Sequence, residues 1–212
     1  MIFPEIVALC KQWEQEFDQI TIARKVKLHR LAKYIDEKRQ AGLVANITVI
    51  CTHNSRRSHF GQLSLALAAD YYQLADIHTY SGGTEATAFN PRAVAVLQAL
   101  GFQISTTEAA SDNPIYAVKW KNEMSPYQAF SKKYETAPNP QKGFGAVMVC
   151  TEADKGCPVV LGCDFRLALP FEDPKVYDNT ELEAIKYKER FLQMGREMCF
   201  VLNHVRQVRA SL

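Results

Sequence analysis

Four short strand-like runs alternate with helical patterns from residue 46 onward. The runs cover residues 47–50, 77–80, 146–149 and 166–169. Each has the length of a buried strand, and helical repeats follow the first, second and last of them. Strands that alternate with helices form a parallel sheet covered on both faces, and ligands bind beyond the carboxyl ends of such strands. We therefore expect an α/β fold with its site at one rim of the sheet.

The first 45 residues do not share this alternation. They carry two blocks of apolar residues at helical steps, which are Ile6, Leu9, Trp13 and Phe17, then Ile22, Val26, Leu28, Leu31 and Ile35. This periodicity predicts two amphipathic helices, the second ending near Gly42. We expect an antiparallel pair packed on a separate domain of residues 46–212, serving stability or self-association into a homo-oligomer.

Two further segments have recognisable local signals. Asn90 and Pro91 mark the start of a helix as its cap and first turn, and Gly101 marks its end. Residues 115–134 alternate loosely between apolar and polar side chains, which predicts a β-hairpin inserted into the domain.

Composition narrows the classes of partner and location. A formal net charge of +2 gives no reason to expect nucleic acid or a charged membrane as partner. No apolar run is long enough to span a bilayer, and the N-terminus lacks the pattern of a signal peptide. We expect a cytoplasmic protein whose six cysteines are reduced at rest. Such cysteines are more often buried, catalytic or metal-bound than bridged.

The segment between the first predicted strand and the following helix runs from Cys51 to Ser58 and reads CTHNSRRS. A helix N-terminus offers unpaired backbone N–H groups and a positive partial charge, which suit a tetrahedral oxyanion. Arg57 lies six residues after Cys51, so its planar guanidinium can fold back and hold two oxygens. The same donors, with the Ser58 hydroxyl, would stabilise the attacking thiolate. The expected oxyanion-binding residues are Thr52, His53, Asn54, Ser55, Arg56 and Arg57. A plain buried cysteine before a polar helix cap is the alternative, and it leaves Arg57 and Ser58 unexplained.

This segment resembles the C-x5-R-S loop of the low-molecular-weight protein tyrosine phosphatases and the thioredoxin-coupled arsenate reductases. The likeness continues through residues 81–85, 90–92 and 101–105, and from 149 to about 205. It does not include residues 1–45 or 115–134. The resemblance implies a three-layer α/β fold around a central parallel four-stranded sheet, and an enzyme that needs no cofactor and no metal.

Two positions of the loop depart from the family pattern. The family usually has glycine where His53 stands, and glycine would ease a positive φ and a close approach to the anion. His53 would narrow the pocket or add a proton-sensitive donor. The position of Arg56 is often small or a cysteine, and we expect Arg56 to point into solvent rather than add charge to the site.

The resemblance also implies an acid loop at residues 171–174, with Asp173 protonating the leaving oxygen of a phosphate ester. An exposed turn is the alternative, because Asp-Pro is a common turn pair. The phosphatases usually carry an aromatic residue directly after this pair, and here Lys175 follows. This departure disfavours a tyrosine phosphatase.

Cys150 and Cys157 match, by resemblance, the two further cysteines of the arsenate reductases. Cys150 would attack the Cys51 adduct, and Cys157 would carry the resulting disulfide to the surface for thioredoxin. The segment between them would have to move, since a disulfide needs Cα atoms within about 7 Å. Two unrelated buried cysteines are an alternative. A zinc site that includes Cys163 is another, although the close cysteine pairing of structural zinc sites is missing.

Three functions remain open from the sequence. The first is arsenate reduction through three cysteines, with thioredoxin as reductant. The second is a phosphatase acting on phosphotyrosine protein or a small phosphoester. The third is a non-enzymatic oxyanion-binding or redox-sensing module, in which His53 and Arg56 prevent catalysis by the loop while oxyanion binding survives.

Overall fold

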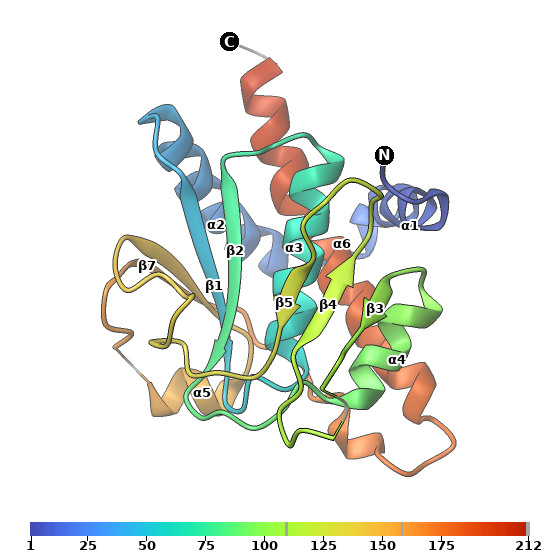
Figure 1. The fold of residues 1–212 in the computed structure, drawn as a ribbon. Helices are drawn as coiled ribbons and strands as arrows, with labels where there is room; N and C mark the ends of the chain where they lie inside the picture. The colour runs from blue at the N-terminus through green and yellow to red at the C-terminus, as the bar shows by residue number, and fades with distance from the viewer. Residues whose placement is uncertain (109, 158, 211–212) are drawn as a thin grey trace.

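A computed structural model describes residues 1–108, 110–157 and 159–210, with side chains described up to residue 207. Its centre is a four-stranded parallel sheet in the order β2-β1-β6-β7 (Figure 1). The strands are β1 (Ala45–Cys51), β2 (Ile77–Gly83), β6 (Phe144–Met148) and β7 (Cys163–Ala168). All four strands and the parallel sheet predicted from the strand-like runs are confirmed.

The strand register brings the expected site residues to one rim. Cys51 is the last residue of β1 and pairs with Gly83 at the end of β2. On the other side of β1, Ile50 pairs with Met148, so Cys150 follows just beyond the end of β6. Because parallel strands share their carboxyl ends, Cys51 and Cys150 lie at the same edge of the sheet.

One face of the sheet is covered by helices, with α2, α3 and α6 lying behind it in Figure 1. The helical segments of this layer are α1 (Pro4–Gln15), the short 3-10 turn η1 (Phe17–Gln19), α2 (Ile22–Gln40), α3 (Arg57–Tyr71) and α6 (Glu183–Ala210). Two glycines allow helices and strands to approach closely in this layer. A Cβ on Gly61 would lie 2.8 Å from Val49, and one on Gly145 would lie 2.7 Å from the Tyr34 ring. Helices α3 and α2 therefore lie directly on β1 and β6.

The two N-terminal helices form as predicted, but the buried face of α2 differs from the prediction. Leu28, Leu31 and Ile35 are buried, whereas Ile22 is 82% and Val26 59% exposed. The inward face starts at Arg24, which pairs with Glu197 on α6, and continues at steps of four, three and four residues. Ile22 and Val26 lie on the opposite side of that helix, so their assignment to the core was wrong. The division into 1–45 and 46–212 stays a prediction.

Helix α1 is anchored mainly on α6. Its buried Trp13 lies so close to Gly195 that a Cβ there would come within 2.1 Å of the indole. Trp13 also packs edge-to-face on Phe191, with ring centroids 5.8 Å apart. Both N-terminal helices thus dock on the C-terminal helix.

On the other face of the sheet, irregular chain in residues 130–142 packs on the carboxyl end of β2, where Lys133 forms a parallel bridge with Gly83. The backbone of Tyr134 crosses so close to Gly82 that a Cβ on this glycine would come within 2.4 Å of it. The Asn139 side chain donates a hydrogen bond of 3.0 Å to the carbonyl of Ser81. This segment completes the three-layer arrangement.

The remaining elements surround the rim. The predicted hairpin is confirmed as β4 (Tyr116–Lys119) and β5 (Tyr127–Ala129), and an unpredicted strand, β3 (Gln103–Ser105), pairs with β4. Helix α4 (Pro91–Ala99) is capped by Asn90 as predicted. The unpredicted helix α5 (Thr151–Gly156) and the 3-10 turn η2 (Pro174–Tyr177) follow β6 and β7. Within the described ranges, no helix has the length and apolar character needed to cross a membrane.

Candidate active site

The sulfur of Cys51 is buried and lies beside a hydroxyl group. Its Sγ lies 3.0 Å from the Ser58 Oγ, in the first turn of α3. Asn54 donates from Nδ2 to the same hydroxyl oxygen at 2.8 Å. Because this oxygen already accepts a hydrogen bond, its proton is free to point at the sulfur. The arrangement lets the Ser58 hydroxyl donate a hydrogen bond to the Cys51 sulfur.

The loop between β1 and α3 turns its carbonyls outward. The carbonyls of Cys51 and Thr52 accept backbone N–H groups from Thr84 and Glu85, and that of Ser55 accepts the N–H of Asn90. The described chain offers no acceptor to the backbone amides of residues 52–56. Free amides in the loop that directly follows Cys51 are suited to form a cradle for an oxyanion.

The strained position of the loop is Asn54 rather than His53. Asn54 has φ of +45°, a left-handed conformation that asparagine tolerates better than most residues. Its Oδ1 accepts the backbone N–H of Lys132 at 2.9 Å, which holds the conformation. The carbonyl of His53 accepts the Ser131 hydroxyl at 2.8 Å, and its ring lies near solvent, 3.5 Å from Glu85. A glycine is therefore not required at position 53.

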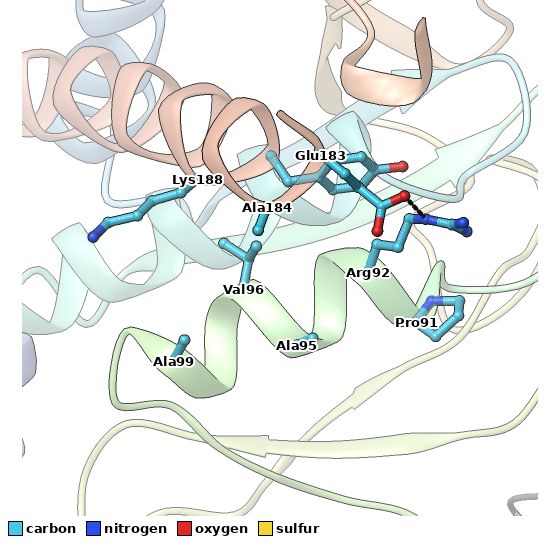
Figure 2. Close-up of a pocket in the computed structure, with 9 residues that line it drawn as sticks. Pro91, Arg92, Ala95, Val96, Ala99, Glu183, Ala184 and Lys188 are labelled. Atoms are coloured by element: carbon cyan, nitrogen blue, oxygen red, sulfur yellow. Dashed lines mark hydrogen bonds and ion pairs between the residues drawn. The ribbon is translucent and has the colours of Figure 1, made fainter. Parts of the chain in front are cut away.

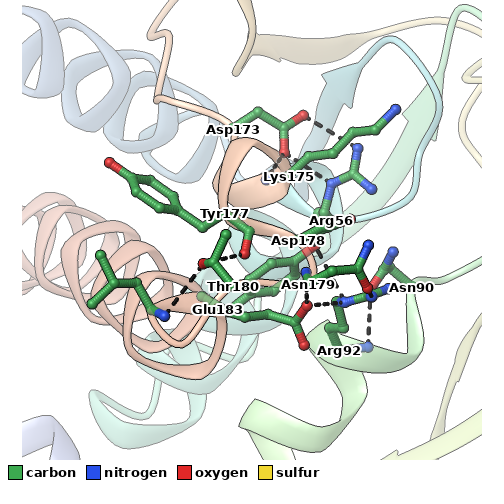
Figure 3. A network of polar contacts seen from close by, with 12 residues as sticks. Arg56, Asn90, Arg92, Asp173, Lys175, Tyr177, Asp178, Asn179, Thr180 and Glu183 are labelled. Atoms are coloured by element: carbon green, nitrogen blue, oxygen red, sulfur yellow. Dashed lines mark hydrogen bonds and ion pairs between the residues drawn. The ribbon is translucent and has the colours of Figure 1, made fainter.

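Arg56 and Arg57 both bind Asp173 (Figure 3 shows the Arg56 contacts). Arg57 donates from Nη2 to Asp173 at 2.7 Å and from Nη1 to the carbonyl of Phe171 at 2.9 Å. Arg56 donates from Nε at 2.9 Å and from Nη2 at 3.3 Å. Arg56 is buried, so the expectation that it points into solvent was wrong. Its burial is possible because the carboxylate of Asp173, far along the chain, pairs with its charge.

Asp173 is held in its charged form by this clamp. Burial by itself raises the pKa of Asp173, but the hydrogen bond from Arg56 and the charges of Arg57 and Arg56 outweigh it. The pKa of Asp173 therefore lies below its ordinary value. Among the described residues, the Arg57 guanidinium makes no polar contact with Cys51. An oxyanion in the cradle would have to draw Arg57 from Asp173, which would return Asp173 toward the neutral acid.

The segment that follows Asp173 is anchored as well. Arg92 on α4 donates from Nε to Glu183 at 2.6 Å and from Nη2 to the Asn179 side chain at 2.7 Å (Figure 3). Glu183 also accepts the backbone N–H of Asn179. Arg92 and Glu183 lie at one end of a mostly apolar cavity of about 650 Å³ between α4 and α6 (Figure 2). The segment after Asp173 is thus fixed to two helices.

Cys150 and Cys157 stand at opposite ends of α5. Cys150 is fully buried, accepts the N–H of Ala153 at 3.3 Å, and lies 3.4 Å from the Thr52 hydroxyl. Cys157 is half-buried and its thiol faces the carbonyl of Val159 at 3.2 Å. At about 1.5 Å per residue, the intact helix separates their Cα atoms by about 10 Å. A bridge between them requires α5 to unwind.

Cys163 is half-buried at the start of β7, and burial together with Asp164 raises the pKa of its thiol. Within the described ranges, no three His, Cys, Asp or Glu side chains are grouped to hold a metal ion.

Sequence reasoning missed Lys132, which lies beside the loop. Its backbone binds Asn54, while its buried ammonium donates to the carbonyl of Phe130 at 3.2 Å and lies over the Phe130 ring. Burial lowers the pKa of Lys132 to about 8. The sequence carries no signal for this, because the contact joins segments 78 residues apart.

We expect Lys132→Met to stabilise the protein at pH 7. The pKa of Lys132 falls from 10.5 to about 8 on folding, so the unfolded chain binds more protons between these values. The difference corresponds to about 3 kcal/mol at most. The gain in the free energy of unfolding over wild type should shrink as pH rises from 8 to 10.5, measured by urea denaturation. The exposed neighbour Lys133→Met is the control, and a pH-independent gain would contradict the burial of this charge.

No family model matches the chain, and no curated protein matches it. Solved structures do. A low-molecular-weight phosphotyrosine phosphatase from Vibrio cholerae O395 is 13% identical with a TM-score of 0.49, covering 77% of this chain and 97% of its own. A phosphatase of the same class from T. tengcongensis is 14% identical with a TM-score of 0.48, and the match covers 76% of this chain and 99% of that one. A thioredoxin-dependent arsenate reductase from Corynebacterium glutamicum is 17% identical with a TM-score of 0.46, and the match covers 87% of this chain and 72% of that one. The similar structures thus include both groups that the loop motif resembles.

Proposed function

We propose that this chain is a thiol-dependent arsenate reductase in which Cys51 is the nucleophile and Cys150 and Cys157 form the disulfide relay. The observation that carries the proposal is the position of Cys150, whose sulfur lies 3.4 Å from the hydroxyl of Thr52, the residue after Cys51. Cys51 ends β1, and Cys150 lies two residues beyond the end of β6, so the two positions are offset by about one residue. With strands about 4.8 Å apart, this offset brings their Cα atoms to roughly 6 Å, within the usual disulfide range. Because neighbouring positions along a strand point to opposite faces, the backbone at Cys150 must also turn before the two sulfurs can meet.

In the first step the Cys51 thiolate attacks the arsenic of arsenate. A sulfur–arsenic bond forms, an arsenic–oxygen bond breaks, and the departing oxygen takes a proton and leaves as water. The free amides of residues 52–56 would hold the remaining oxygens, with Arg57 drawn from Asp173 to the anion.

In the second step the Cys150 thiolate attacks the sulfur of Cys51. The new disulfide forms as the sulfur–arsenic bond breaks, and its electron pair stays on arsenic, which leaves as arsenite. Cys157 then attacks the sulfur of Cys150 and frees the Cys51 thiolate. The Cys150–Cys157 disulfide needs an external dithiol of the thioredoxin class to return it to the reduced form.

Phosphoester hydrolysis is the second candidate, and the Asp173 clamp is the observation that favours it. Asp173 lies within 2.7 Å of the loop arginine, where an acid for a leaving oxygen is needed. Against it, Lys175 replaces the aromatic residue usual after Asp-Pro in the phosphatases it resembles. An enzyme could carry both activities through Cys51, with only arsenate reduction using the other two thiols.

We expect Cys150→Ser and Cys157→Ser each to lower steady-state arsenite formation, with thioredoxin and its reductase, about 100-fold or more. Without either thiol the relay stops after one event at Cys51. Hydrolysis of an aryl phosphate by the same variants should change little. Cys163→Ser is the matched control, since Cys163 is similarly half-buried but lies outside the relay. Undiminished turnover in Cys157→Ser would contradict the relay.

A further inference from the structure

Arg24 links the N-terminal helices to the acid loop. It lies in the first turn of α2, where the Thr21 hydroxyl caps its backbone N–H. Its guanidinium pairs with Glu197 on α6 at 2.5 Å, and its Nη1 donates to the carbonyl of Pro170 at 2.9 Å. The same guanidinium lies 4.5 Å from the centre of the Phe171 ring. One side chain of the extension therefore contacts two consecutive residues at the base of the acid loop.

These contacts lead directly to the loop arginine. The ring of Phe171 meets Arg24, and the carbonyl of the same residue accepts Arg57 at 2.9 Å. Asp173, which also binds Arg57, follows two residues later. A shift of the 170–171 backbone would therefore move an acceptor of Arg57 and the carboxylate that Arg57 shares.

The Arg24–Glu197 pair is well suited to hold that backbone still. The side chains are 21% and 4% exposed, so the pair is little screened by solvent. Arg24 uses its Nε and Nη2 on the carboxylate and its Nη1 on Pro170. A planar fork can meet both demands at once from separate nitrogens held in a fixed geometry.

We propose that Arg24 is a positioning residue for the active site, and that the N-terminal helices act in catalysis by fixing the Pro170–Phe171 backbone through it. The proposal extends the proposed function, on which its catalytic consequence rests. It predicts that loss of the Arg24 contacts disorders the acid loop and misplaces Arg57 and Asp173, at a cost in turnover beyond any loss of stability.

The test compares two double variants in the full chain. Arg24→Met with Glu197→Met removes the pair and leaves no lone buried carboxylate. Arg196→Met with Glu16→Met is the matched control. That pair also joins an N-terminal segment to α6, at 2.7 Å and with similar exposure of the arginine. Thermal unfolding, hydrogen–deuterium exchange of residues 171–178 and arsenate turnover would be measured for both.

We expect the Arg24 double variant to exchange these amides about tenfold faster and to lose kcat by about 10- to 100-fold, as displaced catalytic groups do. The control should keep both values, even where its melting temperature falls as far. Arg24→Lys, which keeps the positive charge but loses the rigid planar fork, should lie between wild type and the double variant. Equal exchange and equal turnover in the two double variants would overturn the proposal. If wild type reduces no arsenate but the exchange difference persists, the proposed function fails and the positioning role stands.

Discussion

Cys51→Ser is expected to abolish arsenate turnover, with a loss of about four orders of magnitude or more. A serine hydroxyl is almost fully protonated at neutral pH, so the first attack loses its nucleophile. The loss is compounded because an oxygen at position 51 cannot form the disulfide by which Cys150 would release arsenite. In a serine protease, loss of the nucleophile alone costs about 10⁶-fold in kcat. The measurement is arsenite formation with thioredoxin and its reductase.

The same variant separates catalysis from binding. The amides of residues 52–56 and both arginines are unchanged, so Cys51→Ser should still bind phosphate or arsenate by calorimetry. Ser58→Ala provides the graded comparison, since it removes only the neighbour 3.0 Å from the sulfur, and one donor of this kind is worth about 10²–10³. Turnover above a tenth of wild type in Cys51→Ser would show that another residue carries the reaction.

The part of this site that the sequence predicts is the part formed by neighbouring residues. The Cys51 loop, the β1–α3 junction and the capped start of α4 all depend on contacts within a few residues, such as Asn90 with Arg92. The two central strands, β1 and β6, were predictable for a related reason, because parallel strands buried on both faces are mostly apolar.

The errors concern contacts between distant parts of the chain. The sequence around Arg56 predicts a surface residue, but Arg56 is buried because it binds Asp173, 117 positions further along the chain. Arg24 interrupts an apolar pattern and is nevertheless the inward residue, because its partner Glu197 lies 173 positions away. Hydrophobic periodicity assigns a charged residue to the solvent face and cannot anticipate a paired, buried one. The short elements β3 and α5, of three and six residues, are too brief to show any period.

Asp173→Asn is expected to lower hydrolysis of an aryl phosphate by about three orders of magnitude at pH 6. An asparagine keeps the shape of the clamp but cannot protonate the leaving oxygen, and general acid catalysis contributes about 10²–10⁴-fold. Release of arsenite from the Cys51 adduct should change far less, because there the leaving group departs from sulfur with its electron pair. The measurements are kcat/KM for hydrolysis of the aryl phosphate and the single-turnover rate of arsenite release from the preformed Cys51 adduct, both across pH.

The clamp predicts the pH dependence as well. The Arg56 hydrogen bond and the charges of Arg57 and Arg56 keep the pKa of Asp173 below its ordinary value despite burial. In wild type the protonated acid is therefore scarce at neutral pH, and phosphoester hydrolysis should fall as pH rises. Arg56→Met removes the hydrogen bond and one charge, so it should move that fall to higher pH; Asp173→Asn should remove it. An unchanged profile in Arg56→Met would contradict the role of the clamp.

The stability of the folded protein should depend on the ionised form of Asp173, whereas acid catalysis depends on its protonated form. The folded protein gains stability from ionised Asp173 above pH 3.8, its ordinary value, and loses it as pH falls through the lowered folded value. The advantage of wild type over Asp173→Asn in the free energy of unfolding should therefore be full at pH 6 and shrink below pH 4. Urea denaturation at pH 3 to 6 measures it. Because the carboxylate that limits acid catalysis is also the one that stabilises the loop, both pH dependences should respond to Arg56→Met. A variant that moved only one of them would show that Asp173 serves the fold and the reaction through different contacts.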